Sequence, residues 1–148
     1  MIARRPAALA AALVAMLTPI AARAQGKRHR LSVAVTNNDP AIMNLALNNT
    51  QNAAELYAAR SEAVDVEIVC YGPGLHMLRE DTSPVKARLA KMKADLPGLT
   101  LSACNNTLRG MAKAEGHDIQ IVPEARVVPA GVVRLIELQE AGWRYIRP

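Results

Sequence analysis

The sequence predicts a single three-layer α/β/α domain with a mostly parallel sheet of about five strands. Segments with strand-like and helix-like spacing of apolar residues alternate from residue 31 to residue 147. Turn-forming residues separate these segments, with clusters at 37–40, 72–74 and 97–98. Because consecutive parallel strands need a crossover connection, the intervening helices are expected to cover both faces of the sheet through right-handed crossovers.

The amino-terminal segment has the pattern of a secretory signal peptide. An arginine pair precedes an apolar run from residue 7 to residue 20, and Ala22 and Ala24 are small residues at the positions that a signal peptidase reads. The run is shorter than the ~20 residues that a membrane-spanning helix needs. We therefore predict a cleaved signal at 1–24, a mature domain at 25–148 without a membrane span, and a periplasmic location. An uncleaved anchor is the alternative, and the arginine pair also fits twin-arginine export.

Charge and aromatic content argue against nucleic-acid binding. Removal of Arg4, Arg5 and Arg23 with the signal lowers the formal net charge from +5 to +2. The remaining cations form no concentrated stripe, and the chain has only 1 Trp and 3 Tyr. About 124 residues remain, which suffices for one domain with its own core but not for two.

The first half of the mature chain supplies two strands and a long helix. Strands are predicted at 31–36 and 64–71, with a helix over 41–60 between them. The helix is expected to bury one apolar face, formed by Ile42, Leu45, Ala46, Ala53, Leu56 and Tyr57. Gly72-Pro73-Gly74 ends the second strand, and a short turn of helix is expected at 75–79.

The second half continues the alternation. Its predicted elements are a helix from Pro84 to the break at Pro97-Gly98, a strand at 99–104, a helix at about 106–115, a strand at 125–128, a helix from Pro129 to Gly142 and a strand at 143–147. The last helix is expected to turn Val132, Leu135 and Ile136 towards the core. Trp143 and Tyr145 share one side of the last strand, where they either anchor a subunit interface or cap the core of one chain.

Three polar segments follow predicted strands at the carboxyl edge of the sheet. They contain Asn37 and Asn38, then Gly72 and Gly74, then Cys104 with Asn105 and Asn106. In open parallel sheets, ligands gather beyond the carboxyl ends of the strands. Two glycines around a proline also let backbone N–H groups face a bound group. We therefore predict a binding site formed by these residues.

Cys104 is the candidate reactive residue of this edge. It ends an apolar strand and stands at the turn into the next helix. Unpaired N–H groups and the positive end of the helix dipole stabilise a thiolate there, and the thiolate is the nucleophilic form. The N–H groups from Asn105 to Thr107 would supply this effect, and Arg109, about one turn further on, could add charge. The alternative is a small buried side chain without a chemical role.

Cys70 lies inside a predicted strand and is interpreted as a core residue. Its distance from Cys104 depends on the strand order, which the sequence leaves open. If the two strands that carry the cysteines flank the first strand, the cysteines lie ~10 Å apart and cannot pair. If those strands are neighbours, the distance is ~5 Å and a disulfide becomes feasible.

No metal site or cofactor is predicted. His76 and His117 lack partners at the spacing of metal ligands. The glycines after the second strand are not followed by the Lys-Ser/Thr pair of a phosphate-binding loop.

Five motifs occur in order between residue 29 and the end of the chain. They are Asn48-Asn49 with Asn52, Tyr71-Gly72-Pro73-Gly74-Leu75, Ala103-Cys104-Asn105-Asn106-Thr107, Val128-Pro129-Ala130-Gly131-Val132 and the segment from Gln139 to Pro148. Together they resemble the exported branch of the DsrE/DsrF-like family. The resemblance implies a Rossmann-like α/β domain, assembly into homo-oligomers (dimers, trimers or hexamers) and a link to sulfur metabolism. It also implies a persulfide-carrying cysteine at Cys104, although Asn105 stands where glycine is expected.

The residues and the resemblance lead to one leading hypothesis of function. Cys104, as a thiolate, accepts a sulfane sulfur from a small sulfur compound, holds it as a persulfide and passes it to a thiol partner protein or small thiol. No base is paired with Cys104 in the sequence, so sulfurtransferase-like carriage is expected rather than hydrolysis. The alternative is a non-catalytic oligomeric binding module that uses the pocket at the carboxyl ends of the strands.

Overall fold

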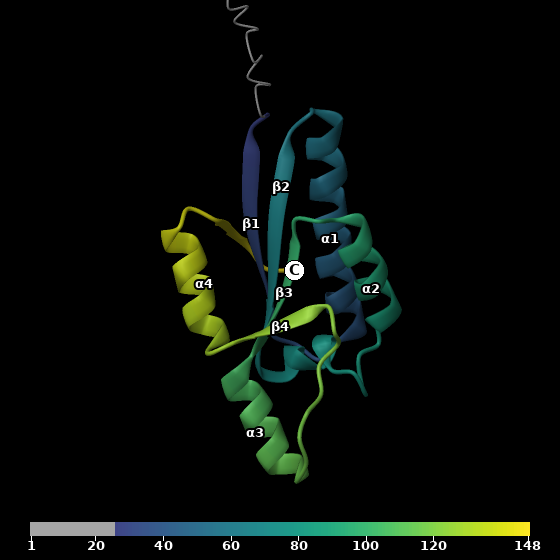
Figure 1. The fold of residues 1–148 in the computed structure, drawn as a ribbon, viewed down its shortest axis with the longest axis vertical. Helices are drawn as coiled ribbons and strands as arrows, with labels where there is room; N and C mark the ends of the chain where they lie inside the picture. Colours follow the sequence, from purple (N-terminus) through teal and green to yellow (C-terminus); the bar gives the residue numbers. More distant parts are fainter. Residues whose placement is uncertain (1–25) are drawn as a thin grey trace, which may run out of the picture.

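The computed structural model describes residues 26–148 (Figure 1). The predicted signal at 1–24 lies outside the described residues. The strands are β1 (Arg28–Val35), β2 (Ala63–Cys70), β3 (Leu99–Cys104), β4 (Ala125–Val128) and β5 (Arg144–Ile146). The helices are α1 (Pro40–Ala59), the 3-10 helix η1 (Gly72–Leu78), α2 (Lys86–Asp95), α3 (Asn105–Glu115) and α4 (Gly131–Glu140). Within 26–148, none of the helices has the length and apolar character to cross a membrane.

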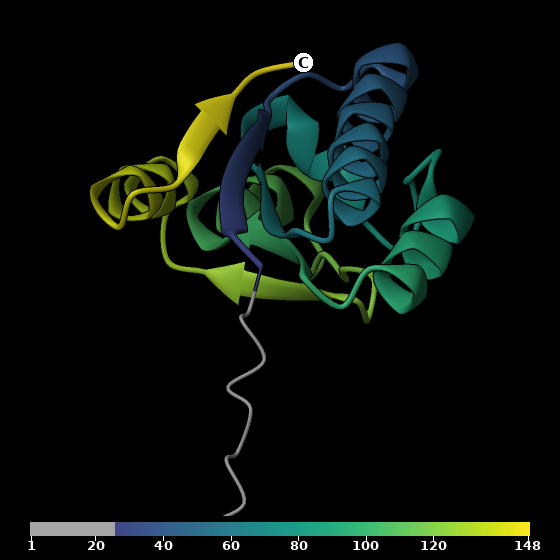
Figure 2. The same cartoon turned by 90° about the horizontal axis from the view of Figure 1, so that it is seen from above.

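All five strands are parallel and lie in the order β4-β3-β2-β1-β5. The predicted α/β domain, with a five-stranded parallel sheet between two layers of helices, is confirmed. The chain crosses the sheet in one direction from β1 to β4 and then returns to place β5 beside β1. With right-handed crossovers, such a reversal moves the connecting helix to the opposite face. Figure 2 shows this arrangement, with α1 and α2 on one face and α4 on the other.

The two faces of the sheet carry different cores. Because successive side chains of a strand point to opposite faces, each strand contributes to both. The larger core, under α1, α2 and η1, contains Val33, Ile68 and Leu101 of the strands. The smaller core, under α4, contains Ala34 and Val69 with residues of that helix.

The buried face of α1 differs from the predicted one. Leu45 and Leu56 are 42% and 53% exposed, whereas Met43 and Thr50 are buried. Thr50 tolerates burial because its hydroxyl donates to the Ala46 carbonyl at 2.9 Å. The prediction merged two stripes of the helix, one that packs on the sheet and one that faces away from it.

The predicted inward face of α4 is also wrong in part. Leu135 is buried as predicted, but Val132 and Ile136 are exposed, and Leu138 is buried instead. The sheet below α4 presents small residues such as Ala34. A narrow stripe of two leucines is therefore enough to cover it.

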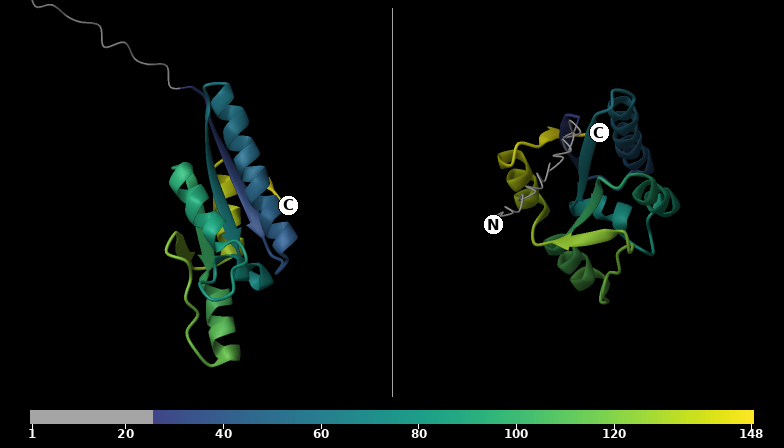
Figure 3. Two further views of the ribbon diagram at one scale, coloured as in Figure 1. Left: turned by 90° about the vertical axis from the view of Figure 1, so that its right-hand side faces the viewer. Right: turned by 45° about the horizontal axis from the view of Figure 1, so that its top comes forward.

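α3 projects beyond the carboxyl edge of the sheet (Figure 3) and has no fully buried residue. Leu108 and Met111, on its inner side, pack against the larger core. The buried guanidinium of Arg79, which follows η1, contacts Glu115 at 2.5 Å and Asp81 at 2.7 Å. This ion-pair cluster fixes the far end of α3, so the helix has a defined position relative to β3.

Candidate functional site

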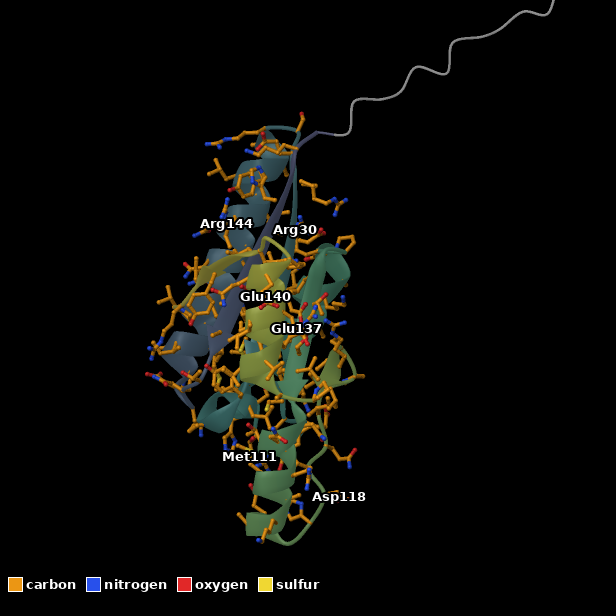
Figure 4. All side chains as sticks on the ribbon, turned by 90° about the vertical axis from the view of Figure 1, so that its left-hand side faces the viewer. Arg30, Met111, Asp118, Glu137, Glu140 and Arg144 are labelled. Carbon is orange, nitrogen blue, oxygen red and sulfur yellow. The ribbon has the colours of Figure 1, made fainter. Side chains whose placement is uncertain are left out.

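Cys104 lies where two helices begin. It is the last residue of β3 and the N-cap of α3. Its partner in β4 is Val128, from which the chain runs through Pro129 and Ala130 into α4. Figures 1 and 4 show the start of α3 beside the start of α4. The unpaired N–H groups and positive dipole ends of both helices therefore meet near one sulfur atom.

The surroundings of Cys104 favour its thiolate. Burial raises the pKa of the thiol, but hydrogen bonding from the Thr107 hydroxyl and from the backbone N–H groups of Gly131, Thr107 and Asn106 lowers it by more. The Cys104 side chain makes no capping hydrogen bond to the first turn of α3. The net result is a pKa below the ordinary value of a cysteine, which increases the fraction of the nucleophilic form.

Thr107 is oriented by the turn after β2. The N–H of Gly72 donates to Thr107 Oγ1 at 3.0 Å. A hydroxyl that accepts one bond can still donate its own hydrogen, here towards the sulfur of Cys104. Gly72, a predicted binding residue, thus reaches the sulfur indirectly through Thr107.

Gly131 is a site residue that the sequence reasoning missed. A Cβ atom at this position would lie 3.0 Å from Cβ and 3.1 Å from Cδ1 of Tyr71. Glycine therefore lets the start of α4 approach the sheet closely enough for its N–H to face Cys104. The sequence held a signal for this residue. The segment from Val128 to Gly131 comes at the end of a predicted strand, as do the three polar segments from which the binding site was predicted.

Within residues 26–148, three predicted residues near the ends of β1 and β2 share no hydrogen bond with Cys104, Thr107 or Gly131. Asn37 and Asn38 are exposed, and the Asn37 side chain accepts a bond from the Thr36 hydroxyl at 3.2 Å. Gly74 is buried, and a Cβ atom there would lie 2.2 Å from the Val35 carbonyl oxygen. Close packing of η1 on β1 therefore accounts for this glycine without a ligand.

The first turns of α3 contribute backbone groups rather than charge. Asn106 supplies its N–H to Cys104 while its side chain is exposed, and Asn105 is half-buried at the first helical position. Arg109 is exposed on the surface of α3. The main groups that lower the pKa of the Cys104 thiol do not include Arg109, so its contribution of charge stays a prediction.

The structure resolves the relation between the two cysteines. β2 and β3 are neighbours, but Cys70 stands opposite Ala103, so Cys104 is one residue further along and points to the other face. Both cysteines are free. Burial raises the pKa of the Cys70 thiol far above its ordinary value, and its sulfur lies 3.9 Å from that of Met77. Cys70 is a core residue, as predicted.

A cavity of about 270 Å³ lies beside the loop that leads into α4. It is lined by Arg126, Val128, Pro129, Ala130 and Arg134, among others. Cys104 does not line this cavity, so a ligand there would contact the loop rather than the sulfur. In the part of the chain that the structure describes, no three His, Cys, Asp or Glu side chains form a group that could hold a metal ion.

Comparison with known proteins gives a family match and a structural match. The model of the DsrE/DsrF-like family matches residues 3–148. A solved structure of a protein of unknown function from Methanobacterium thermoautotrophicum is 30% identical in sequence, with a TM-score of 0.68. That match covers 81% of this chain and 99% of the other. No curated protein matches the chain.

Proposed function

The chain belongs to the DsrE/DsrF-like family, and we propose that within it this protein carries sulfane sulfur as a persulfide on Cys104. Members of the family are generally sulfur transfer proteins. The observation that carries the proposal is the position of Cys104, which ends β3 at the start of α3 and pairs with Val128, just before α4. The Thr107 hydroxyl and the backbone N–H groups of Gly131, Thr107 and Asn106 lower the pKa of its thiol. Such a set of donors stabilises the thiolate needed to attack a sulfane sulfur.

The proposed reaction is an exchange without a net oxidation or reduction. The Cys104 thiolate attacks the outer sulfur of a hydropersulfide R–S–SH. The new S–S bond forms to Cys104, the old S–S bond breaks, and R–S⁻ leaves with the electron pair. The product is Cys104–S–SH, whose outer sulfur an acceptor thiolate then attacks in the same way, which returns Cys104 as a thiolate.

The burial of Cys104 limits which donors can react. Cys104 as a whole residue is 5% exposed, compared with 0% for Cys70. A donor must therefore present a terminal sulfur on a slender chain, as a linear polysulfide or a persulfide on an extended thiol does. The low exposure of Cys104 would also favour an acceptor whose thiol is exposed over one whose thiol is buried in a strand.

The proposal is tested by loading followed by transfer. The mature protein, comprising residues 25–148, is incubated with an inorganic polysulfide, desalted, and analysed by intact-mass spectrometry. The expected product carries one added sulfur atom, located on Cys104 by peptide analysis, and a small thiol then removes it. A protein that gains no sulfur, or that gains it at random sites, would leave the non-catalytic binding module as the better explanation.

We also propose that the chain is exported with cleavage after Ala24. The support is the signal pattern of residues 1–24 in the sequence. Expressed with its leader in a bacterium, the protein recovered from the periplasm is expected to begin at Gln25. Amino-terminal sequencing checks this, and full-length protein retained in the cytoplasmic fraction would contradict it.

We further propose that the protein is a homo-oligomer. Large apolar side chains are exposed on two separate helices, in addition to Tyr145 on the edge strand β5: Leu45 and Leu56 of α1, and Val132, Val133 and Ile136 of α4. Clusters of this kind mark association surfaces. A monomeric mass by light scattering at micromolar concentration would rule out a stable assembly.

A further inference from the structure

Glu67 is a buried carboxylate that the proposed sulfur chemistry does not use. It lies on β2 beneath α4 and is 2% exposed. The Ser102 hydroxyl donates to its Oε1 at 2.7 Å, and Nη2 of Arg126 donates to the same oxygen at 2.9 Å. Burial raises the pKa of this carboxyl, but the bonds from Arg134, Ser102 and Arg126 lower it by more. Glu67 is therefore ionised at neutral pH.

Arg134 connects this carboxylate to α4, the helix seen from its outer side in Figure 4. Its Nε donates to Oε1 and its Nη2 to Oε2 of Glu67, both at 2.8 Å. A bidentate pair fixes the angle between two groups as well as their distance. The backbone N–H of Arg134 donates to the Ala130 carbonyl at 2.9 Å, which closes the first turn of the helix. Gly131, whose N–H faces Cys104, begins that same turn.

The other contacts beneath α4 are apolar and less directional. Leu135 and Leu138 pack with Ala34 and Val69, Tyr71 and Trp143 lie against this cluster, and Gly131 lies against Tyr71. Apolar packing limits how closely the helix approaches the sheet, but it is non-directional and does not define how far the helix slides along its axis as sharply as a bidentate bond does. A buried ion pair is also a weak source of net stability compared with apolar residues of the same volume. Fixing the geometry is therefore the better explanation for a charge in this position.

We propose that Glu67 and Arg134 are positioning residues that fix the first turn of α4, so that the N–H of Gly131 is held against the sulfur of Cys104. The inference rests on the proposed role of Cys104 as a thiolate carrier. It adds to the site two residues that do not touch the sulfur.

Arg126 offers a matched control. It bonds the same carboxylate as Arg134, but it belongs to β4, whose position is set by its ladder with β3. Arg126→Met therefore removes an equal charge from Glu67 without releasing α4. Arg134→Lys is the complementary variant, because it keeps the charge of Arg134 and loses the bidentate geometry.

The experiment measures the rate of Cys104 alkylation against pH, in protein that carries Cys70→Ala. Arg134→Met is expected to slow alkylation at neutral pH by ~5-fold, through loss of one donor, and to move the profile to higher pH. Arg134→Lys is expected to shift the profile in the same direction by less. Arg126→Met is expected to leave it unchanged.

Unchanged profiles in Arg134→Met and Arg134→Lys would overturn the inference. An equal shift in Arg126→Met would also overturn it, because loss of positive charge would then explain the effect. If circular dichroism shows that Arg134→Met does not fold, Arg134→Lys against Arg126→Met decides the question. An ordinary cysteine pKa in the parent protein would instead count against the proposed function, whatever the variants do.

Discussion

Replacing Cys104 with serine is expected to abolish persulfide loading, with an adduct about 100-fold below that of the parent protein or lower. A serine hydroxyl is nearly the same size as the thiol but is not ionised at neutral pH, so it cannot attack a sulfane sulfur. The surrounding N–H groups of Asn106 and Gly131 can bond the serine oxygen, so we expect the fold to survive. Intact-mass spectrometry after exposure to polysulfide measures the loss.

Cys70→Ala is the control for that variant. Cys70 is 0% exposed and its pKa is raised, so its thiol is both inaccessible and protonated. The variant is expected to load sulfur at the parent rate, with a stability loss of about 1 kcal/mol from the small cavity. If sulfur loading persists in Cys104→Ser, or disappears in Cys70→Ala, Cys104 is not the residue that carries the sulfur.

Replacing Thr107 with valine is expected to raise the pKa of Cys104, because the thiolate loses a hydrogen-bond donor. Valine keeps the branched shape but removes the hydroxyl that donates to the sulfur and accepts from the Gly72 N–H. A raised pKa means less thiolate at any pH below it. Loading at neutral pH is therefore expected to slow by up to ~10-fold, with the rates converging at alkaline pH.

Thr82→Val is the matched control for Thr107→Val. The Thr82 hydroxyl bonds Nδ1 of His76 at 2.8 Å on an exposed part of the chain. Both substitutions replace a threonine hydroxyl with a methyl group. An equal loss of Cys104 reactivity in the two variants would therefore show a general effect on the fold. No shift of the alkylation profile in Thr107→Val would show that this hydroxyl does not stabilise the thiolate.

The fold was predictable because its signals are local. The apolar strand segments, and the breaks at Gly72-Pro73-Gly74 and Pro97-Gly98, mark the elements without knowledge of tertiary contacts. The helix faces were less predictable, because periodicity finds apolar stripes without showing what covers each one. Leu45 and Leu56 lie on such a stripe and are exposed in the single chain. The strand order was not accessible at all, since it depends on where α4 returns the chain.

The site was predictable to the extent that it depends on strand ends. Cys104 and Gly72 come from adjacent strands whose carboxyl ends meet at one edge. Gly131 was missed because its approach depends on the packing of α4 against Tyr71, a contact far apart in sequence. Glu67 lies inside the predicted strand at 64–71, and only the structure shows that its partners are Arg126 and Arg134.

The most direct test of the account is the pKa of Cys104 itself, measured from the pH dependence of its alkylation in Cys70→Ala protein. The donors from Thr107, Asn106 and Gly131 predict a midpoint below that of a free cysteine, with a sulfur adduct on Cys104 after exposure to polysulfide. A midpoint at or above that value, together with no adduct, would contradict the account and leave Cys104 as a packed residue of a binding module.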